Sequence, residues 1–108
     1  PKRTIMRSMI GILKQELIRL KEAEKSYLRE IRKLPRGSLQ RKKIKGIDYL
    51  YLVSSRHSKI SYRYVRESEF KQLKEKIALR KKYQKLLKEV RNNIKRISGI
   101  VHAKRRAV

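Results

Sequence analysis

The stretch KIKGIDYLYLVSSRHSKISYRYV, residues 43–65, decides the fold of this chain and contains four of its six tyrosines. Apolar and aromatic residues recur in it with a period of two, which is typical of β-strands. Lys45-Gly46 predicts a tight turn, because glycine readily adopts positive φ, and residues 55–58 predict a second turn of four residues. Together with the preceding SLQRKKI, the stretch predicts a three-stranded antiparallel β-meander over residues 38–65.

The residues on either side of the meander repeat with a helical period instead. Residues 5–34 place apolar side chains at alternating steps of three and four, the pattern of a coiled-coil seam, with Glu24 as its polar interruption. Residues 69–98 carry a similar stripe and predict a second helix, and Gly99 predicts its end. Residues 99–108 are expected to form a loosely ordered basic tail.

Two helices of similar length around a small sheet predict a mainly α fold and a single domain, residues 1–108. We expect the two long, coiled-coil-like helices to run antiparallel, with the meander reversing the chain between them. A hairpin of this size buries little apolar surface, because a short chain has a modest core. The apolar stripes therefore predict further helix partners, and we expect a homodimer or a higher homo-oligomer.

The charge of the chain is strongly one-sided. Lysine and arginine number 33 against 9 aspartate and glutamate residues, which gives a net charge of +24. Self-repulsion at this density destabilises a compact state unless a polyanion neutralises it, and nucleic acid is the commonest polyanion. Residues 35–66 are the most unbalanced part, with nine basic residues against Asp48 alone. The cations predict phosphate contacts, and a purely solvated surface is the alternative.

Three groups of cations are candidates for phosphate binding. One lies at the start of the meander, one in its second turn and third strand, and one along a face of the second helix. The predicted nucleic-acid-binding residues are Arg41, Lys42, Lys43, Lys45, Arg56, Lys59, Arg63, Arg66, Arg80, Lys81, Lys82, Lys85 and Lys88.

Tyr49, Tyr51, Tyr62 and Tyr64 allow two interpretations. Aromatic rings interleaved with lysine and arginine on a small sheet can stack on unpaired bases, as in proteins that bind single-stranded RNA. The alternative is cross-strand packing that seats the sheet against the helix ends. We expect this face to pack toward the helix ends, and the leucines of the second strand to be covered by a partner or a helix.

No pattern in the sequence indicates catalysis, a metal or a cofactor. The chain has no cysteine, which excludes disulfides, thiolate metal sites and cysteine nucleophiles. His57 and His102 have no paired carboxylate near them, and no glycine-rich phosphate loop or metal motif occurs. No apolar run approaches the roughly 20 residues of a membrane span, and no signal peptide is indicated. We therefore expect a cytoplasmic protein that is not an enzyme, has no catalytic or metal-binding residues and binds no cofactor.

The stretch GSLQRKKIKGIDYLYLVSSRHSKISYRYV and the later LKEKIALRKKYQKLLKEV resemble a recurring small prokaryotic domain of uncharacterised function. A Gly-Ser start, a Lys-Gly turn, two Tyr-rich strands and a basic helix carry the resemblance, over residues 36–90. The resemblance implies a helix–meander–helix shape and transfers no catalytic residues.

The sequence as a whole predicts a non-enzymatic, highly basic nucleic-acid-binding protein, an accessory or regulatory subunit with a ribonucleoprotein as one kind of partner. We favour RNA over DNA, because tyrosines on a sheet suit unpaired bases and no helix-turn-helix or zinc-finger layout occurs. The alternative is a protein–protein interaction module, antitoxin-like or a scaffold subunit, whose basic faces meet an acidic partner. Membrane binding is not expected, because the helices lack an aromatic apolar face.

Overall fold

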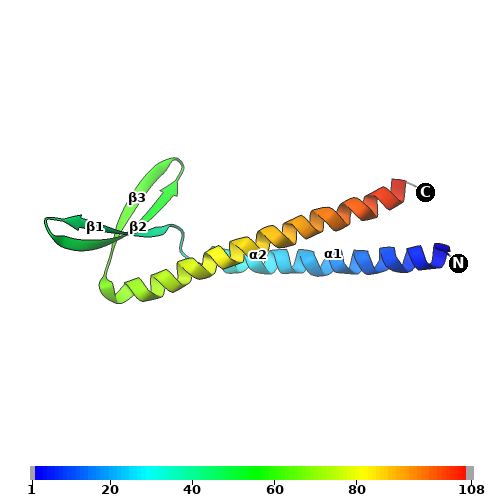
Figure 1. The fold of residues 1–108 in the computed structure, drawn as a ribbon, viewed down its shortest axis with the longest axis horizontal. Helices are drawn as coiled ribbons and strands as arrows, with labels where there is room; N and C mark the ends of the chain where they lie inside the picture. Colours follow the sequence, from blue (N-terminus) through cyan, green and yellow to red (C-terminus); the bar gives the residue numbers. More distant parts are fainter. Residues whose placement is uncertain (1, 107–108) are drawn as a thin grey trace. The chain divides into compact units, whose positions relative to one another are not determined.

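The computed structural model describes the backbone of residues 2–106 and the side chains of residues 8–103. Its elements follow in the order α1 (Lys2–Lys33), β1 (Ser38–Ile44), β2 (Ile47–Arg56), β3 (Lys59–Val65) and α2 (Glu67–Arg106) (Figure 1). The predicted fold class is confirmed, since two long helices pack together and an antiparallel three-stranded meander lies between them in the chain.

The chain forms two compact units. The helix unit contains α1 up to Arg29 and α2 from Gln84 onward. The sheet unit, Glu30–Tyr83, contains the last turn of α1, the whole meander and the first part of α2. Each unit has buried apolar side chains of its own.

Among the described side chains of the helix unit, α1 and α2 are joined by apolar residues and by one charge pair. Leu20 of α1 and Leu87 of α2 are buried. Glu24, the polar interruption of the predicted seam, accepts a hydrogen bond from Arg91 Nε at 3.0 Å. An exposed pair of this kind stabilises by only about 0–1 kcal/mol, but a charged residue beside an apolar seam selects one alignment of two helices. Glu24 is thereby explained by its partner on the opposite helix.

The second helix does not end at Gly99, as the sequence predicts, but continues to Arg106. Val101 is buried, and it extends the apolar stripe that passes through Ile94 and Ile97 by steps of three and four. Packing of this stripe offsets the cost of a glycine in a helix, about 1 kcal/mol relative to alanine. The prediction of a loosely ordered tail is therefore wrong up to residue 106, and residues 107 and 108 lie outside the described part of the chain.

The strands of the sheet unit are staggered. The sheet has the order β1-β2-β3, and β2, with ten residues, is longer than either neighbour. β1 pairs with residues 47–53 of β2, whereas β3 pairs with residues 50–56. Each hairpin therefore ends in a part only two strands wide. We call residues 43–48 the first tip and residues 54–61 the second tip.

Both tips close through two-residue turns with positive φ at each central residue. Lys45 and Gly46 have φ of 52° and 79°, and His57 and Ser58 have φ of 51° and 63°. This geometry matches the right-handed twist of the flanking strands, which is why two-residue hairpins use it. The Lys45-Gly46 turn is confirmed. The four-residue second turn is wrong, because β2 continues to Arg56 and pairs with β3 up to the two turn residues.

One face of the sheet packs against the first part of α2. Side chains alternate between the two faces of a strand, and the even-numbered residues of β2 point to the helix. We call this the leucine face. Its buried cluster consists of Leu50, Leu52 and Val65 with Ile77 of α2, and Leu39, Phe70 and Leu73 pack around it.

The opposite face carries Tyr49, Tyr51, Tyr62 and Tyr64, and we call it the tyrosine face. Tyr62 and Tyr64 are 54% and 57% exposed. The prediction that these rings pack toward the helix ends is therefore wrong. The leucines of β2 are covered by a helix, which was one of the two expected possibilities. Branched aliphatic side chains permit close approach of a helix, whereas a tyrosine hydroxyl requires a hydrogen-bond partner when it is buried.

This assignment of faces predicts unequal effects of two truncations. Leu52→Ala removes a buried side chain and should lower the free energy of unfolding by about 2–5 kcal/mol. Tyr62→Ala removes an exposed ring whose contacts are edge-to-face pairs, and should cost only about 1 kcal/mol. Urea unfolding followed by circular dichroism measures both. A larger loss for Tyr62→Ala than for Leu52→Ala would show that the sheet packs through its tyrosines.

Candidate nucleic-acid interface

Four of the predicted binding residues gather at the two tips of the meander. Lys43 and Lys45 belong to the first tip, where Asp48 is the Cα partner of Lys43. Arg56 and Lys59 are Cα partners directly before and after the turn of the second tip. All four cations are exposed. Two separate pairs of exposed cations therefore lie at opposite ends of the sheet.

The predicted residues Arg41 and Arg63 lie at the two edges of the sheet and contact side chains of α2. The guanidinium carbon of Arg41 lies 5.3 Å from the centre of the Phe70 ring, a cation–π contact. Arg63 Nη1 lies 4.0 Å from Glu69 Oε2. The two arginines are separated by β2, since Arg41 is on β1 and Arg63 on β3. They therefore do not form one row of cations, and Arg66 follows β3 as an exposed residue.

Arg80 has a structural role that the sequence analysis missed. Its Nη1 donates hydrogen bonds to the carbonyl oxygens of Leu34 at 2.7 Å and Ile31 at 3.1 Å. The last carbonyls of a helix have no partners within the helix, and a cation at that end also interacts favourably with the helix dipole. Partial burial, and to a lesser extent the nearby charge of Arg36, lower the pKa of Arg80. Arg80 thus caps the end of α1.

Four further predicted cations lie on α2 and are all exposed. They belong to different units: Lys81 and Lys82 to the sheet unit, and Lys85 and Lys88 to the helix unit. Their side chains are long and solvated, so they can meet phosphates without disturbing a core.

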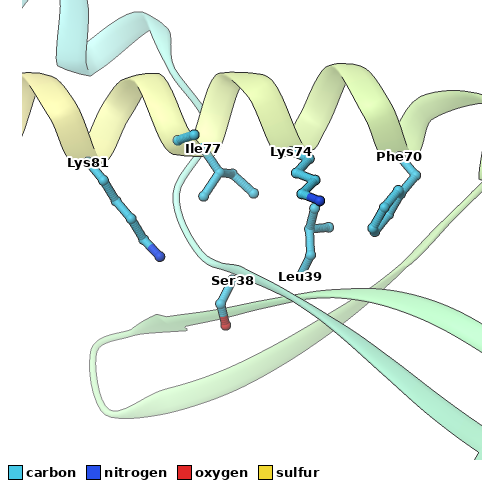
Figure 2. A pocket seen from close by; sticks show the side chains of 7 residues that line it. Ser38, Leu39, Phe70, Lys74, Ile77 and Lys81 are labelled. Carbon is cyan, nitrogen blue, oxygen red and sulfur yellow. The ribbon is translucent and has the colours of Figure 1, made fainter.

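Lys81 also borders an open cavity of about 330 Å³ between β1 and α2. Figure 2 shows Phe70 and Ile77 extending from the helix toward Leu39 on the strand, with Lys81 on the side of Ser38. The cavity lies beside the buried cluster and shares Leu39, Phe70 and Ile77 with it. Its apolar wall belongs to the core, and Lys74 and Lys81 bring two positive charges to it.

The tyrosine face combines four rings with one cation. Tyr64 lies 6.4 Å from Tyr49 and 6.3 Å from Tyr51, and Tyr51 lies 6.5 Å from Tyr62, measured between ring centres. The rings of each pair are inclined at 63–89°, so each contact is edge to face. Lys42 Nζ lies 4.2 Å from the centre of the Tyr62 ring and 5.9 Å from that of Tyr51.

The position of Lys42 shows what sequence reasoning could have found. Lys42 is an even-numbered residue of β1, yet its Cα partner is Tyr49, so it shares the tyrosine face, whereas Arg41 and Lys43 share the leucine face. The three adjacent cations therefore divide between two faces. Strand alternation alone could have separated them, because the register follows once the first turn is placed.

The described part of the chain shows no metal-binding group and no membrane-spanning helix. Among its side chains, no group of three or more His, Cys, Asp or Glu residues is placed to hold a metal ion. Over the same residues, neither helix is long and apolar enough to cross a membrane. In comparisons with protein-family models, curated proteins and solved structures, nothing matches this chain. The resemblance to a small prokaryotic domain therefore stays an interpretation of the sequence.

Two adjacent cations of α2 should respond differently to the same substitution. Arg80→Gln removes charged hydrogen bonds to two helix-end carbonyls and should lower the free energy of unfolding by about 1.5–3 kcal/mol. Lys81→Gln removes an exposed charge and should leave stability unchanged within about 0.5 kcal/mol. Thermal unfolding of both variants tests the cap. Equal stabilities would show that Arg80 is not needed at the end of α1.

Proposed function

We propose that this protein is a non-enzymatic nucleic-acid-binding protein, an accessory or regulatory subunit that binds mainly through phosphate contacts. The observation that carries the proposal is the distribution of charge around the sheet. Exposed cations lie at both tips of the meander, and residues 35–66 hold nine basic residues against Asp48 alone. The fold uses Arg80 as a cap, but the tip cations are in solvent, where like charges repel one another without stabilising the chain.

Binding would neutralise this repulsion. Each phosphate that pairs with a lysine or arginine releases condensed counterions, and this release is the source of affinity that does not depend on sequence. The net charge of +24 supplies many such contacts. RNA is favoured over DNA because an exposed aromatic sheet suits unpaired bases, which occur mainly in RNA loops and ends. A ribonucleoprotein in the cytoplasm is the setting that we propose.

A protein–protein module with an acidic partner is the second candidate. The observation that favours it is the exposure of large apolar side chains in the helix unit, where Met9 and Ile12 of α1 are 56% and 65% exposed. Purification separates the two candidates. Nucleic acid that copurifies, and that a high-salt wash or a nuclease removes, supports the first. An acidic protein that remains bound after nuclease treatment supports the second.

The same apolar side chains support a homodimer. Leu13 and Leu17, in the seam between the helices, are only partly buried, and Ile12 is largely exposed. A second copy can cover these side chains once salt screens the repulsion between two cationic chains. Light scattering at micromolar concentration and high salt should therefore report a dimer. A monomer under these conditions contradicts the homodimer.

The phosphate contacts can be assigned by two variants that each remove four charges. One changes the tip residues Lys43, Lys45, Arg56 and Lys59 to Gln, and the other changes Lys81, Lys82, Lys85 and Lys88 of α2 to Gln. The slope of log affinity against log salt on a single strand should fall by about 0.7 for each phosphate contact removed. We expect both variants to flatten the slope. If a variant keeps the wild-type slope, its four residues do not contact phosphates. If both variants keep the wild-type slope, binding through these phosphate contacts is contradicted.

A further inference from the structure

We propose that the tyrosine face is a stacking platform for the bases of single-stranded nucleic acid, with Tyr62 and Tyr64 as the rings that contact bases. This inference rests on the proposed function, because it assigns the bases a place on a protein whose cations bind the phosphates. It also names the ligand more narrowly, as a strand with unpaired bases.

The geometry of the rings supports stacking. Tyr62 and Tyr64 alternate along β3, and both are more than half exposed. Their contacts with Tyr49 and Tyr51 are all edge to face, so none of these pairs stacks two tyrosines flat against each other. The half-buried Tyr49 and Tyr51 of the central strand support the two exposed rings from the side. A planar base can therefore meet a ring whose orientation its neighbours already hold.

A single cation, Lys42, stands on the platform itself. Its ammonium group lies 4.2 Å from the centre of the Tyr62 ring, and it forms no ion pair with a carboxylate of the described side chains. A base that stacks on Tyr62 would take the place of this ammonium and bring a phosphate within reach of the flexible lysine. Aromatic rings for bases together with a cation for the backbone is the combination that single-strand binders use.

The tips extend the same path. From Tyr49 to Val53, the Cα partner of Tyr62, the tyrosine face covers about 13 Å along β2 at the rise of a strand. Small sheets of this kind stack about two or three bases. Beyond the rings, Lys45 lies in the turn of the first tip. At the second tip, Arg56 and its Cα partner Lys59 lie on the side of the leucine face, because Arg56 is an even-numbered residue of β2. A strand that crosses the face therefore finds Lys45 beyond one end of the aromatic row, and it reaches Arg56 and Lys59 only by passing around the two-stranded second tip.

Charge favours this occupant over a second copy of the chain. Two tyrosine faces brought together would also bring together two sets of tip cations and two copies of Lys42, at a net charge of +24 for each chain. A duplex fits less well, because its bases are stacked on each other and cannot be reached by the rings.

Two probes with the same number of phosphates separate stacking from phosphate binding. One is an oligouridylate of about ten nucleotides, within the site sizes of single-strand binding modules. The other is an abasic oligonucleotide of equal length. The wild-type chain should bind the oligouridylate more tightly, by roughly fivefold to a hundredfold per stacked base. The double variant Tyr62→Ala with Tyr64→Ala should bind the two probes equally.

Two further variants show whether a change in binding comes from the loss of an aromatic ring or from a disturbed fold. Tyr62→Phe keeps the ring and should keep most of the preference for the probe with bases. Ile60→Ala removes an exposed apolar side chain from the same face and should leave the preference unchanged. Because the chain has no tryptophan, tyrosine fluorescence can be followed in the wild-type protein without any substitution. The oligouridylate should quench it more than the abasic probe does.

The outcomes distinguish the two proposals. Equal wild-type affinity for both probes, with equal quenching, overturns stacking but leaves phosphate binding intact. No binding to either probe at low salt overturns the proposed function together with the stacking platform. A preference for bases that survives in the double variant also overturns this inference, because the bases would then be bound elsewhere on the chain.

Discussion

The packing of Leu50, Leu52 and Val65 against the first part of α2 is the contact on which the rest of the sheet unit depends. Val65 is 1% exposed, and it lies opposite Leu50 across the two strands. Because side chains alternate along a strand, the residues next to those covered by α2 lie on the opposite, uncovered face of the sheet. The exposure of Tyr62 and Tyr64 is therefore a result of aliphatic packing on the opposite face, and no other interaction is needed to keep these rings in solvent.

Most of the fold follows from short-range patterns in the sequence. The two helices, the three strands and the Lys45-Gly46 turn were predictable, because period and turn chemistry act within a few residues. The choice between the two faces of β2 was not, since both faces of that strand are apolar. The edge strands carried a weak signal, because Leu39 and Val65 share a face with Leu50. The end of α2 was missed because Val101 lies beyond a glycine, and helix propensity was given more weight than packing.

The candidate interface was predictable in composition but not in geometry. A count of cations identified the meander as the most basic part of the chain. It could not distinguish Arg80, whose hydrogen bonds cap α1, from its exposed neighbour Lys81. It also treated Arg41, Lys42 and Lys43 as one cluster, although the register places Lys42 apart from the other two. These distinctions depend on contacts with residues far along the chain, which a local pattern does not contain.

The stagger of the strands has a kinetic consequence. At each tip the sheet is only two strands wide, and its lysine and arginine side chains are exposed to water. Such cations can follow a moving phosphate without adopting one geometry, and they capture a polyanion at long range by electrostatic steering. Contacts between bases and the tyrosine rings break more slowly than these phosphate contacts, because neighbouring rings already hold the tyrosines in their orientation. On our proposals, the tips would govern how fast a strand arrives, and the tyrosine face how long it stays.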